Sequence, residues 1–241
     1  MGFFESNVET RTGIPDIKQM TDHLPSLNDL AIKHKADKSS LYHNFASKYD
    51  RLLSGVRDTF TNVLEIGVAQ GQSLKMWTDY FPNAAIHGAD IDPSCAASAS
   101  YSNRISFHLL DQGNETHLKS MIMFAPFDLI IDDGNHWWRE QIVSFKSLFP
   151  LVKKGGIYIV EDTCTSYWRE YKNHPISCVQ HFKNMVDEVN LWGARGRYPA
   201  NPPQEFIDWE KGWHRREDCH INLPDFESIH FMNAIIVIHK R

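Results

Sequence analysis

Short apolar runs alternate with longer segments of helical pattern through the middle of the chain. Between the runs lie SLKMWTDYF, SCAASAS, ETHLKSMIMF and WREQIVSFKSLFPLV, and in the last of these apolar residues recur at helical spacing. Strands buried on both faces read as near-continuous apolar runs, and their alternation with helices is typical of parallel βαβ units. The pattern predicts a mostly parallel, doubly wound α/β sheet. Its five strands are expected at residues 62–68, 84–91, 104–110, 127–133 and 155–162.

The end of the chain departs from this rhythm. Two short β-prone runs, 229–232 and 234–239, lie on either side of Asn233. Runs of this length with a break between them predict an antiparallel hairpin. We therefore expect a C-terminal hairpin that extends the parallel sheet.

The remaining segments suggest how one domain, residues 1–241, is organised. The stretch after the fifth strand is aromatic and proline-rich, and we expect it to cover the carboxyl edge of the sheet, where open α/β folds bind ligands. A surface loop is the alternative for that stretch. The expected parts are an N-terminal helical segment at 1–55, a ligand-binding core at 56–162, a cap-like insertion at 163–225 and the C-terminal β-hairpin at 226–241.

Composition and charge exclude several classes of protein. A formal charge of −5 argues against a nucleic-acid binder, which would normally show a basic patch. No apolar run approaches the roughly 18 residues of a membrane span, and the start of the chain lacks the basic and apolar regions of a signal peptide. Gly2 and Ser6 match the short N-myristoylation pattern, which leaves lipidation open. The four cysteines are widely spaced, which favours free thiols and a cytoplasmic location.

The first predicted strand ends in a glycine-containing turn. Glu65, Gly67 and Gly71 fall at this end, and glycines let the backbone approach a ligand closely. The dinucleotide fingerprint GxGxxG is absent, because position 69 is Ala, and this argues against a nicotinamide cofactor. The E-x-G form resembles the S-adenosylmethionine (SAM) loop of methyltransferases, although a tight strand-to-helix turn explains it equally well.

The next two strands also end in polar residues. Asp90 lies about twenty residues beyond the glycine turn, where an acidic side chain can accept the ribose hydroxyls of an adenosine. Asp111 and Gln112 follow the third strand, where methyltransferases usually contact the adenine. Each residue also has a capping or turn interpretation. Polar residues at three consecutive strand ends favour the cofactor interpretation.

The fourth and fifth strands end in carboxylates. Asp133 follows one strand, Glu161 and Asp162 follow the other, and both strand ends should meet at the same edge of the sheet. Oxygen ligands of this kind suit Mg²⁺ (or Mn²⁺), which can bind a hydroxyl and lower its pKa. His136 lies three residues after Asp133 and can then take the proton. The alternative is helix capping, with Asp133 or Asn135 at one helix and the Glu161–Asp162 pair at another.

The motifs together resemble a known family. They run through residues 63–68, 71–77, 81–92, 111–112, 127–136, 148–168 and 228–236. The chain is similar to the metal-dependent sugar O-methyltransferases of macrolide and related pathways, the macrocin and mycinamicin type, which have the Rossmann-like class I methyltransferase fold. The resemblance implies SAM and Mg²⁺ as cofactors and a sugar or glycosylated small molecule as acceptor. It implies metal ligands at Asp133, Glu161 and Asp162, catalysis by His136 and Asp133, and SAM contacts at Glu65, Gly67, Gly71, Ser73, Asp90, Asp111, Gln112, Asp132 and Tyr42.

The sequence departs from the family pattern at two places, and several other classes of protein are alternatives. The loop GVAQGQS is shorter than is usual in the family, and Asn135 stands where Ser is common. A catechol-type O-methyltransferase commonly has Lys where His136 stands, and an iron hydroxylase would need two histidines with one carboxylate. A non-catalytic SAM-binding protein and an RNA methyltransferase are further alternatives. The acceptor sugar and any homo-oligomer stay open. Four tryptophans are candidates for stacking on a sugar face: Trp168, Trp192, Trp209 and Trp213.

Overall fold

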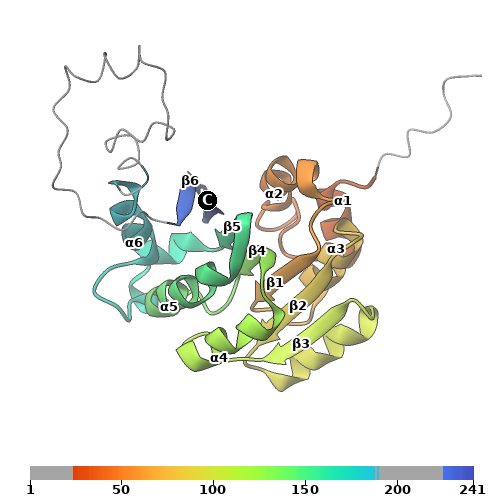
Figure 1. Ribbon diagram of the computed structural model, residues 1–241, viewed down its shortest axis with the longest axis horizontal. Helices are drawn as coiled ribbons and strands as arrows, with labels where there is room; N and C mark the ends of the chain where they lie inside the picture. Colours follow the sequence, from red (N-terminus) through yellow and green to blue (C-terminus); the bar gives the residue numbers. More distant parts are fainter. Residues whose placement is uncertain (1–23, 188, 190–224) are drawn as a thin grey trace, which may run out of the picture.

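A seven-stranded sheet forms the centre of the protein in the computed structural model, which describes residues 24–187, 189 and 225–241 (Figure 1). The strand order is β3-β2-β1-β4-β5-β7-β6. Strands β1 to β5 pair in parallel, whereas β7 pairs antiparallel with both β5 and β6. The strands are β1 (Asn62–Ile66), β2 (Ala85–Asp90), β3 (Ile105–Leu109), β4 (Phe127–Asp132), β5 (Val152–Val160), β6 (Phe226–Met232) and β7 (Ile235–Lys240). The expected parallel sheet with a C-terminal antiparallel hairpin is confirmed.

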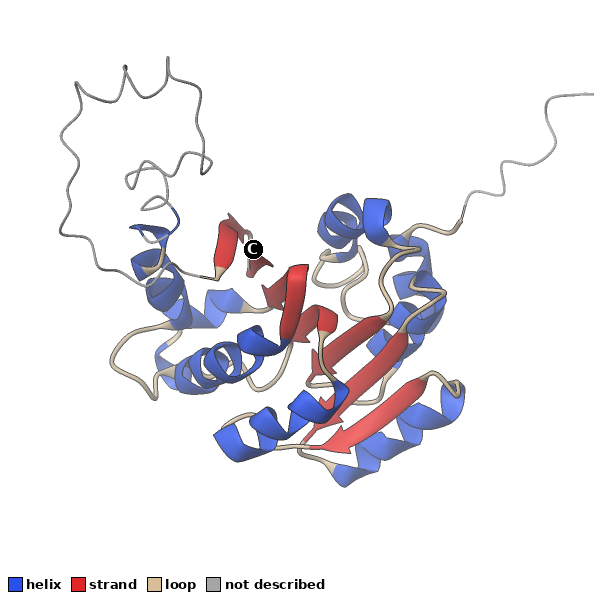
Figure 2. Ribbon diagram, in the orientation of Figure 1, coloured by secondary structure: helices blue, strands red, loops and turns tan. Residues whose placement is uncertain are grey.

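Helices cover both faces of the sheet (Figure 2). The α-helices are α1 (Leu27–His34), α2 (Ala46–Leu53), α3 (Gln72–Tyr80), α4 (Glu115–Ser120), α5 (Trp138–Leu148) and α6 (Cys178–Asn184). Short 3-10 helices are η1 (Ser54–Val56), η2 (Pro93–Tyr101), η3 (Met121–Phe124), η4 (Phe149–Leu151), η5 (Thr163–Tyr167) and η6 (Arg169–Tyr171). The small-residue stretch SCAASAS thus forms a 3-10 helix, and β5 begins three residues earlier than expected.

Alternation along the strands divides the apolar side chains between two cores. Leu129 and Ile131 of β4 pack with the apolar residues of α1, α2 and α3. Ile130, between them, packs on the opposite face with Phe145 of α5 and Phe182 of α6. Successive side chains of a strand point to opposite faces of a sheet. This alternation decides where the two carboxylates at the end of β4 can point.

Several expectations concern residues outside the described part of the chain. They are Gly2, most of the expected cap-like insertion, and the tryptophans Trp192, Trp209 and Trp213. Within the described residues, no helix has both the length and the apolar character needed to cross a bilayer.

Two histidines stack on the neighbouring strands β2 and β3. The rings of His87 in β2 and His108 in β3 are 5.2 Å apart, and His87 Nδ1 lies 2.9 Å from His108 Nε2. Phe124 and Phe127 pack against the His87 ring. Burial, and then repulsion from His108, lowers the pKa of His87 from 6.5 to about 4. The folded protein therefore keeps this imidazole neutral at a pH where the unfolded chain protonates it.

The His87 pair should weaken the fold on acidification. Between pH 6.5 and about 4 the unfolded chain binds more protons at His87, so the free energy of unfolding falls as the pH falls through this window. His87→Gln should reduce that loss by about 1–3 kcal/mol. Urea denaturation at pH 7 and pH 4.5 measures the difference. Equal acid sensitivity of the variant and the parent protein would contradict this interpretation.

Candidate active site

The adjacent carboxylates Asp132 and Asp133 face opposite sides of the sheet. Asp132 is 1% exposed, and it accepts hydrogen bonds from Gln112 Nε2 at 2.5 Å and from the Tyr158 hydroxyl at 3.3 Å. Burial raises the pKa of Asp132 to about 7. Gln112 in turn accepts a bond from the Asn135 backbone amide at 3.0 Å. Asp132 therefore stabilises the loop after β4 through Gln112, whereas Asp133 points to the opposite face of the sheet.

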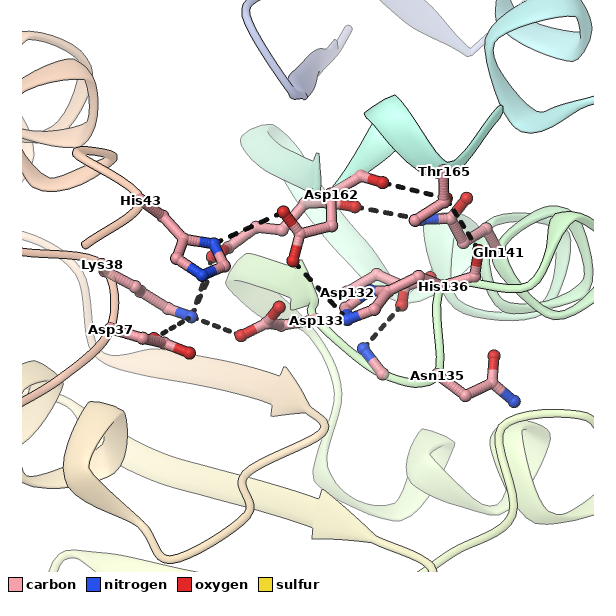
Figure 3. Close-up of polar contacts among 12 residues, drawn as sticks. Asp37, Lys38, His43, Asp132, Asp133, Asn135, His136, Gln141, Asp162 and Thr165 are labelled. Carbon is pink, nitrogen blue, oxygen red and sulfur yellow. Dashed lines mark hydrogen bonds and ion pairs between the residues drawn. The ribbon is translucent and has the colours of Figure 1, made fainter. Parts of the chain in front are cut away.

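Asp133 faces a buried lysine that the sequence analysis did not single out. Lys38 comes from the segment between α1 and α2, and it is 1% exposed (Figure 3). Its Nζ lies 2.5 Å from Asp133 Oδ2, 3.1 Å from Glu161 Oε1 and 3.3 Å from Glu65 Oε1. Burial opposes the charge of Lys38, but these carboxylates outweigh it and raise the pKa of the ammonium. Lys38 therefore carries its positive charge among the carboxylates at the ends of β1, β4 and β5.

Glu161 is held by two groups from the N-terminal part of the chain. The Tyr49 hydroxyl of α2 donates to Glu161 Oε1 at 2.5 Å, and Lys38 Nζ donates to Oε2 at 3.2 Å. Burial, followed by repulsion from Asp133, raises the pKa of Glu161 well above its usual range. Glu161 is 1% exposed, so its carboxylate lies behind the surface of the site.

Asp162 lies on the open side of the cluster between two histidines. Its Oδ2 is 3.6 Å from His136 Nε2 and its Oδ1 is 3.5 Å from His43 Nδ1 (Figure 3). Both Asp162 (φ 49°) and His136 (φ 59°) adopt the left-handed region. The Thr165 hydroxyl contacts the backbone carbonyls of both residues, at 2.9 Å from His136 and 3.0 Å from Asp162. Such strain persists only where the surroundings over-determine the conformation, and it is concentrated at functional sites.

The donor set fits a hard divalent cation. Asp133, His136 and Asp162 each offer one ligand atom, and these atoms lie within 4.8 Å of one another. His136 Nδ1 is buried and has no hydrogen-bond partner within the described residues. A second group of the same kind joins Asp133 with Glu65 and Glu161. The three predicted metal ligands therefore do not form one group: Asp133 belongs to both, Asp162 to the first and Glu161 to the second.

Helix capping does not explain these carboxylates. The N-cap of α5 is Trp137, which makes no side-chain cap bond, and Asp162 precedes η5 without a cap bond from its carboxylate. Asn135 does form a turn bond, because its Oδ1 accepts from the Trp137 backbone amide at 3.1 Å. The capping alternative is thus wrong for Asp133 and Asp162.

A cavity of about 640 Å³ opens beside this cluster at the carboxyl ends of β1, β2 and β4. Ligand pockets commonly have this size, and open α/β sheets bind ligands where the strand order reverses, as it does between β1 and β4. Four of the predicted site residues lie outside its wall: Glu65, Gly71, Asp132 and Glu161. Glu65 instead accepts a 2.6 Å hydrogen bond from the Ser73 hydroxyl. The predicted residues that line the cavity are Tyr42, Gly67, Ser73, Asp90, Asp111, Gln112, Asp133, His136 and Asp162.

Two residues shape the turn at the end of β1. Asp90 Oδ2 accepts the backbone amides of Val68 at 3.0 Å and Ala69 at 3.1 Å, so its carboxylate fixes the turn as well as facing the cavity. Gly67 has a φ of 81°, and a Cβ there would overlap the backbone carbonyl of Asp133. Gly67 is therefore what lets the turn after β1 pack on the loop after β4.

Gly67→Ala should destabilise the protein by at least about 2 kcal/mol, because it combines a disfavoured φ with a backbone clash. Gly55→Ala is the matched control, since no atom lies within 4 Å of a Cβ at Gly55. Urea denaturation of both variants checks the difference. Equal losses for the two variants would show that the close approach at Gly67 is unimportant.

Comparisons with known proteins bear on the identity of this site. No family model matches the chain. The L-olivosyl-oleandolide 3-O-methyltransferase of Streptomyces antibioticus is 39% identical over 184 residues, which are 70% of this chain and 47% of that protein. The 8-demethyl-8-alpha-L-rhamnosyl tetracenomycin-C 2'-O-methyltransferase of Streptomyces olivaceus is 32% identical over 198 residues, 76% of this chain and 51% of that protein.

A solved structure agrees with these relatives. The MycE methyltransferase from the mycinamycin biosynthetic pathway, in complex with Mg, SAH and mycinamycin VI, superposes with a TM-score of 0.72 at 27% identity. The match covers 90% of this chain and 54% of that one. The strand order and fold are those of a class I methyltransferase. The chain belongs to the family of sugar O-methyltransferases of macrolide and tetracenomycin pathways, and it spans about half the length of the curated relatives it matches.

Proposed function

We propose that the protein transfers the methyl group of SAM to a hydroxyl of a sugar, or of a glycosylated small molecule, with the help of Mg²⁺ or Mn²⁺. The observation that carries this proposal is the cluster of Asp133, His136 and Asp162 in the wall of a ligand-sized cavity at the point where the strand order reverses. The Mg and SAH bound to MycE, and the small molecule mycinamycin VI in one of its complexes, support the same chemistry here.

The cavity wall offers the groups that SAM needs. We propose that Asp90 accepts the ribose hydroxyls and that Asp111 and Gln112 contact the adenine, since these residues line the cavity at the ends of β2 and β3. Gly67 and Ser73 line the end of β1, and Tyr42 lines the cavity from the segment between α1 and α2. When bound, SAM supplies an activated methyl group on its sulfonium.

Three predicted cofactor residues do not line the cavity but contact the residues around it. Glu65 holds the Ser73 hydroxyl, and Asp132 holds the Gln112 amide. At Gly71, which has a φ of 78°, a Cβ would overlap the Ser98 side chain, so this glycine allows the start of α3 to pack closely on η2. We propose that Glu65, Gly71 and Asp132 position the cofactor site through these contacts.

The carboxylates at the ends of β4 and β5 are the proposed metal ligands. Asp133 and Asp162 already face the cavity, and Glu161 lies beside Asp133 across the shared Lys38 ammonium. A divalent ion held by these residues would supply the Lewis acidity that lowers the pKa of an acceptor hydroxyl. Asp162 also lies next to the base, because its Oδ2 is 3.6 Å from His136 Nε2.

His136 is the proposed general base. Its ring lines the cavity, and its backbone is fixed by the bond from Thr165. An imidazole is suited to take a proton near neutral pH. Transfer then requires the acceptor oxygen to lie in line with the methyl group, so positioning by the cavity wall contributes as well.

An exposed aromatic surface beside His136 suits a glycosidic acceptor. Trp137 is 41% exposed and Trp168 is 48% exposed, and both rings pack against Tyr171, at 6.2 Å and 5.8 Å. Aromatic faces stack well on apolar rings and sugar faces. A catechol-type acceptor is the second candidate. The relatives that act on sugars, and His136 in place of the lysine common in catechol-type enzymes, favour the sugar.

Calorimetric titration tests this proposal. SAM and its demethylated product are titrated into EDTA-treated protein, and the titration is repeated with Mg²⁺ and a panel of glycosides and nucleotide-linked deoxysugars. The proposal predicts that SAM binds and that acceptor heat appears only with Mg²⁺. Absence of SAM binding under all conditions would remove the methyltransferase assignment. Binding of catechols in preference to glycosides would favour the second candidate.

A further inference from the structure

Lys38 has no part in the proposed reaction, yet it is among the most deeply buried charged side chains of the described residues. Three carboxylates surround its ammonium, those of Glu65, Asp133 and Glu161, at 2.5 to 3.3 Å. A buried charge is tolerated only when it is paired, and leaving either side unpaired is strongly destabilising. The ammonium is therefore the counter-ion that allows these carboxylates to be buried together.

The same three carboxylates also form a cation-binding group without Lys38. One oxygen from each lies within 4.8 Å of the others, as in a metal site. Glu65 Oε1 is fully buried and accepts no hydrogen bond within the described part of the chain, although it lies 3.3 Å from Lys38 Nζ. Oxygen groups of this kind are the ligands of hard divalent cations. The ammonium thus occupies the position that such a cation would take.

Two cation positions share one carboxylate. The inner position lies among Glu65, Asp133 and Glu161 and holds the ammonium. The outer position lies at Asp133 and Asp162, with the proposed base His136 beside it. A positive charge at the inner position repels a divalent ion at the outer one and competes with it for Asp133. The two cations are therefore expected to bind antagonistically.

We propose that Lys38 is an internal counter-ion that fills a second cation site and lowers the affinity of the divalent ion by competing with it for Asp133. The competition at Asp133 rests on the proposed metal site, whereas the second cation site rests on the Lys38 contacts alone. In this arrangement the fold is stable before the metal binds, and the metal stays exchangeable. Lys38 is a positioning residue, because it acts on the reaction only through the carboxylates.

Lys38→Met tests the proposal by removing the charge while keeping a long side chain. The metal-free variant should melt at a lower temperature than the parent protein, and Mn²⁺ should raise its melting temperature much more than that of the parent. Calorimetry should show a dissociation constant for Mn²⁺ at least about tenfold lower, or a second bound ion. A purely structural lysine would give destabilisation without any gain in metal affinity.

Two further variants separate charge from other effects. Lys38→Arg keeps the charge and should return the Mn²⁺ affinity toward that of the parent protein. Lys48→Met is the matched control, since Lys48 lies nearby on α2 and donates to the Asn233 carbonyl at 2.8 Å rather than to the carboxylates; its Mn²⁺ affinity should be unchanged.

The outcomes distinguish this proposal from the proposed function. Unchanged or weaker Mn²⁺ binding by Lys38→Met, beside normal binding by the parent protein, overturns the role of Lys38 and leaves the metal site intact. If Lys38→Met binds Mn²⁺ and the parent protein does not, the result supports the second cation site and counts against the metal dependence of the parent protein. A variant that fails to fold both with and without Mn²⁺ contradicts the proposal, because the ion then cannot replace the ammonium.

Discussion

Asp133→Asn should lower the rate of methyl transfer by at least about 10³-fold, since it removes the ligand shared by both cation positions. The amide keeps the size of the side chain but no longer neutralises Lys38 or attracts a divalent ion. Mg²⁺ affinity, measured by calorimetry, should fall together with the rate. Binding of the demethylated cofactor product should persist, because the cofactor residues proposed at the ends of β1, β2 and β3 are unchanged.

Asp37→Asn is the matched control for this variant. Asp37 also lines the cavity and lies 3.9 Å from Lys38, but it is mostly exposed and belongs to neither cation group. Its effect on the rate should stay within about fivefold, as expected for an exposed charge that is screened by solvent. Full activity of Asp133→Asn would refute the assignment of Asp133 as a metal ligand.

His136→Ala should reduce kcat by about 10²–10⁴-fold, the usual contribution of a general base. SAM binding and Mg²⁺ binding should change much less than kcat, because Asp133 and Asp162 remain. The measurement is the formation of methyl ether under saturating SAM and acceptor, with binding of both cofactors followed separately.

His43→Ala is the control for the base, since His43 faces the other oxygen of Asp162 at 3.5 Å. Its loss should affect kcat by less than about tenfold, because only one histidine is needed to take the proton. A larger loss at His43 than at His136 would transfer the role of base from His136 to His43.

The strand ends could be predicted from the sequence because their signal is local. Each apolar run is short and is followed by a polar residue, and parallel strands bring those residues to one edge. The strand ends do share one edge of the sheet, where Asp90, Asp111, Asp133 and Asp162 line a single cavity. The local signal did not predict that Asp132 and Asp133 point to opposite faces of the sheet, which follows from the alternation along β4.

Lys38 could not be predicted in the same way. It lies in a polar segment between two helices, and its carboxylate partners are 27, 95 and 123 residues further along the chain. No periodicity links such positions. The one indication in the sequence was that several converging carboxylates need a cation beside them. A metal ion was the only cation expected there. The structure shows that part of that need is met by the chain itself.

The most direct test of the proposed function is methyl transfer itself, measured by mass spectrometry with SAM and a panel of deoxysugar glycosides. Two reactions are compared, one with Mg²⁺ and one with EDTA. A methylated glycoside that forms with Mg²⁺ and disappears with EDTA is the predicted result. Equal turnover in EDTA would contradict the metal site at Asp133 and Asp162, and methylation of catechols but of no glycoside would contradict the sugar acceptor.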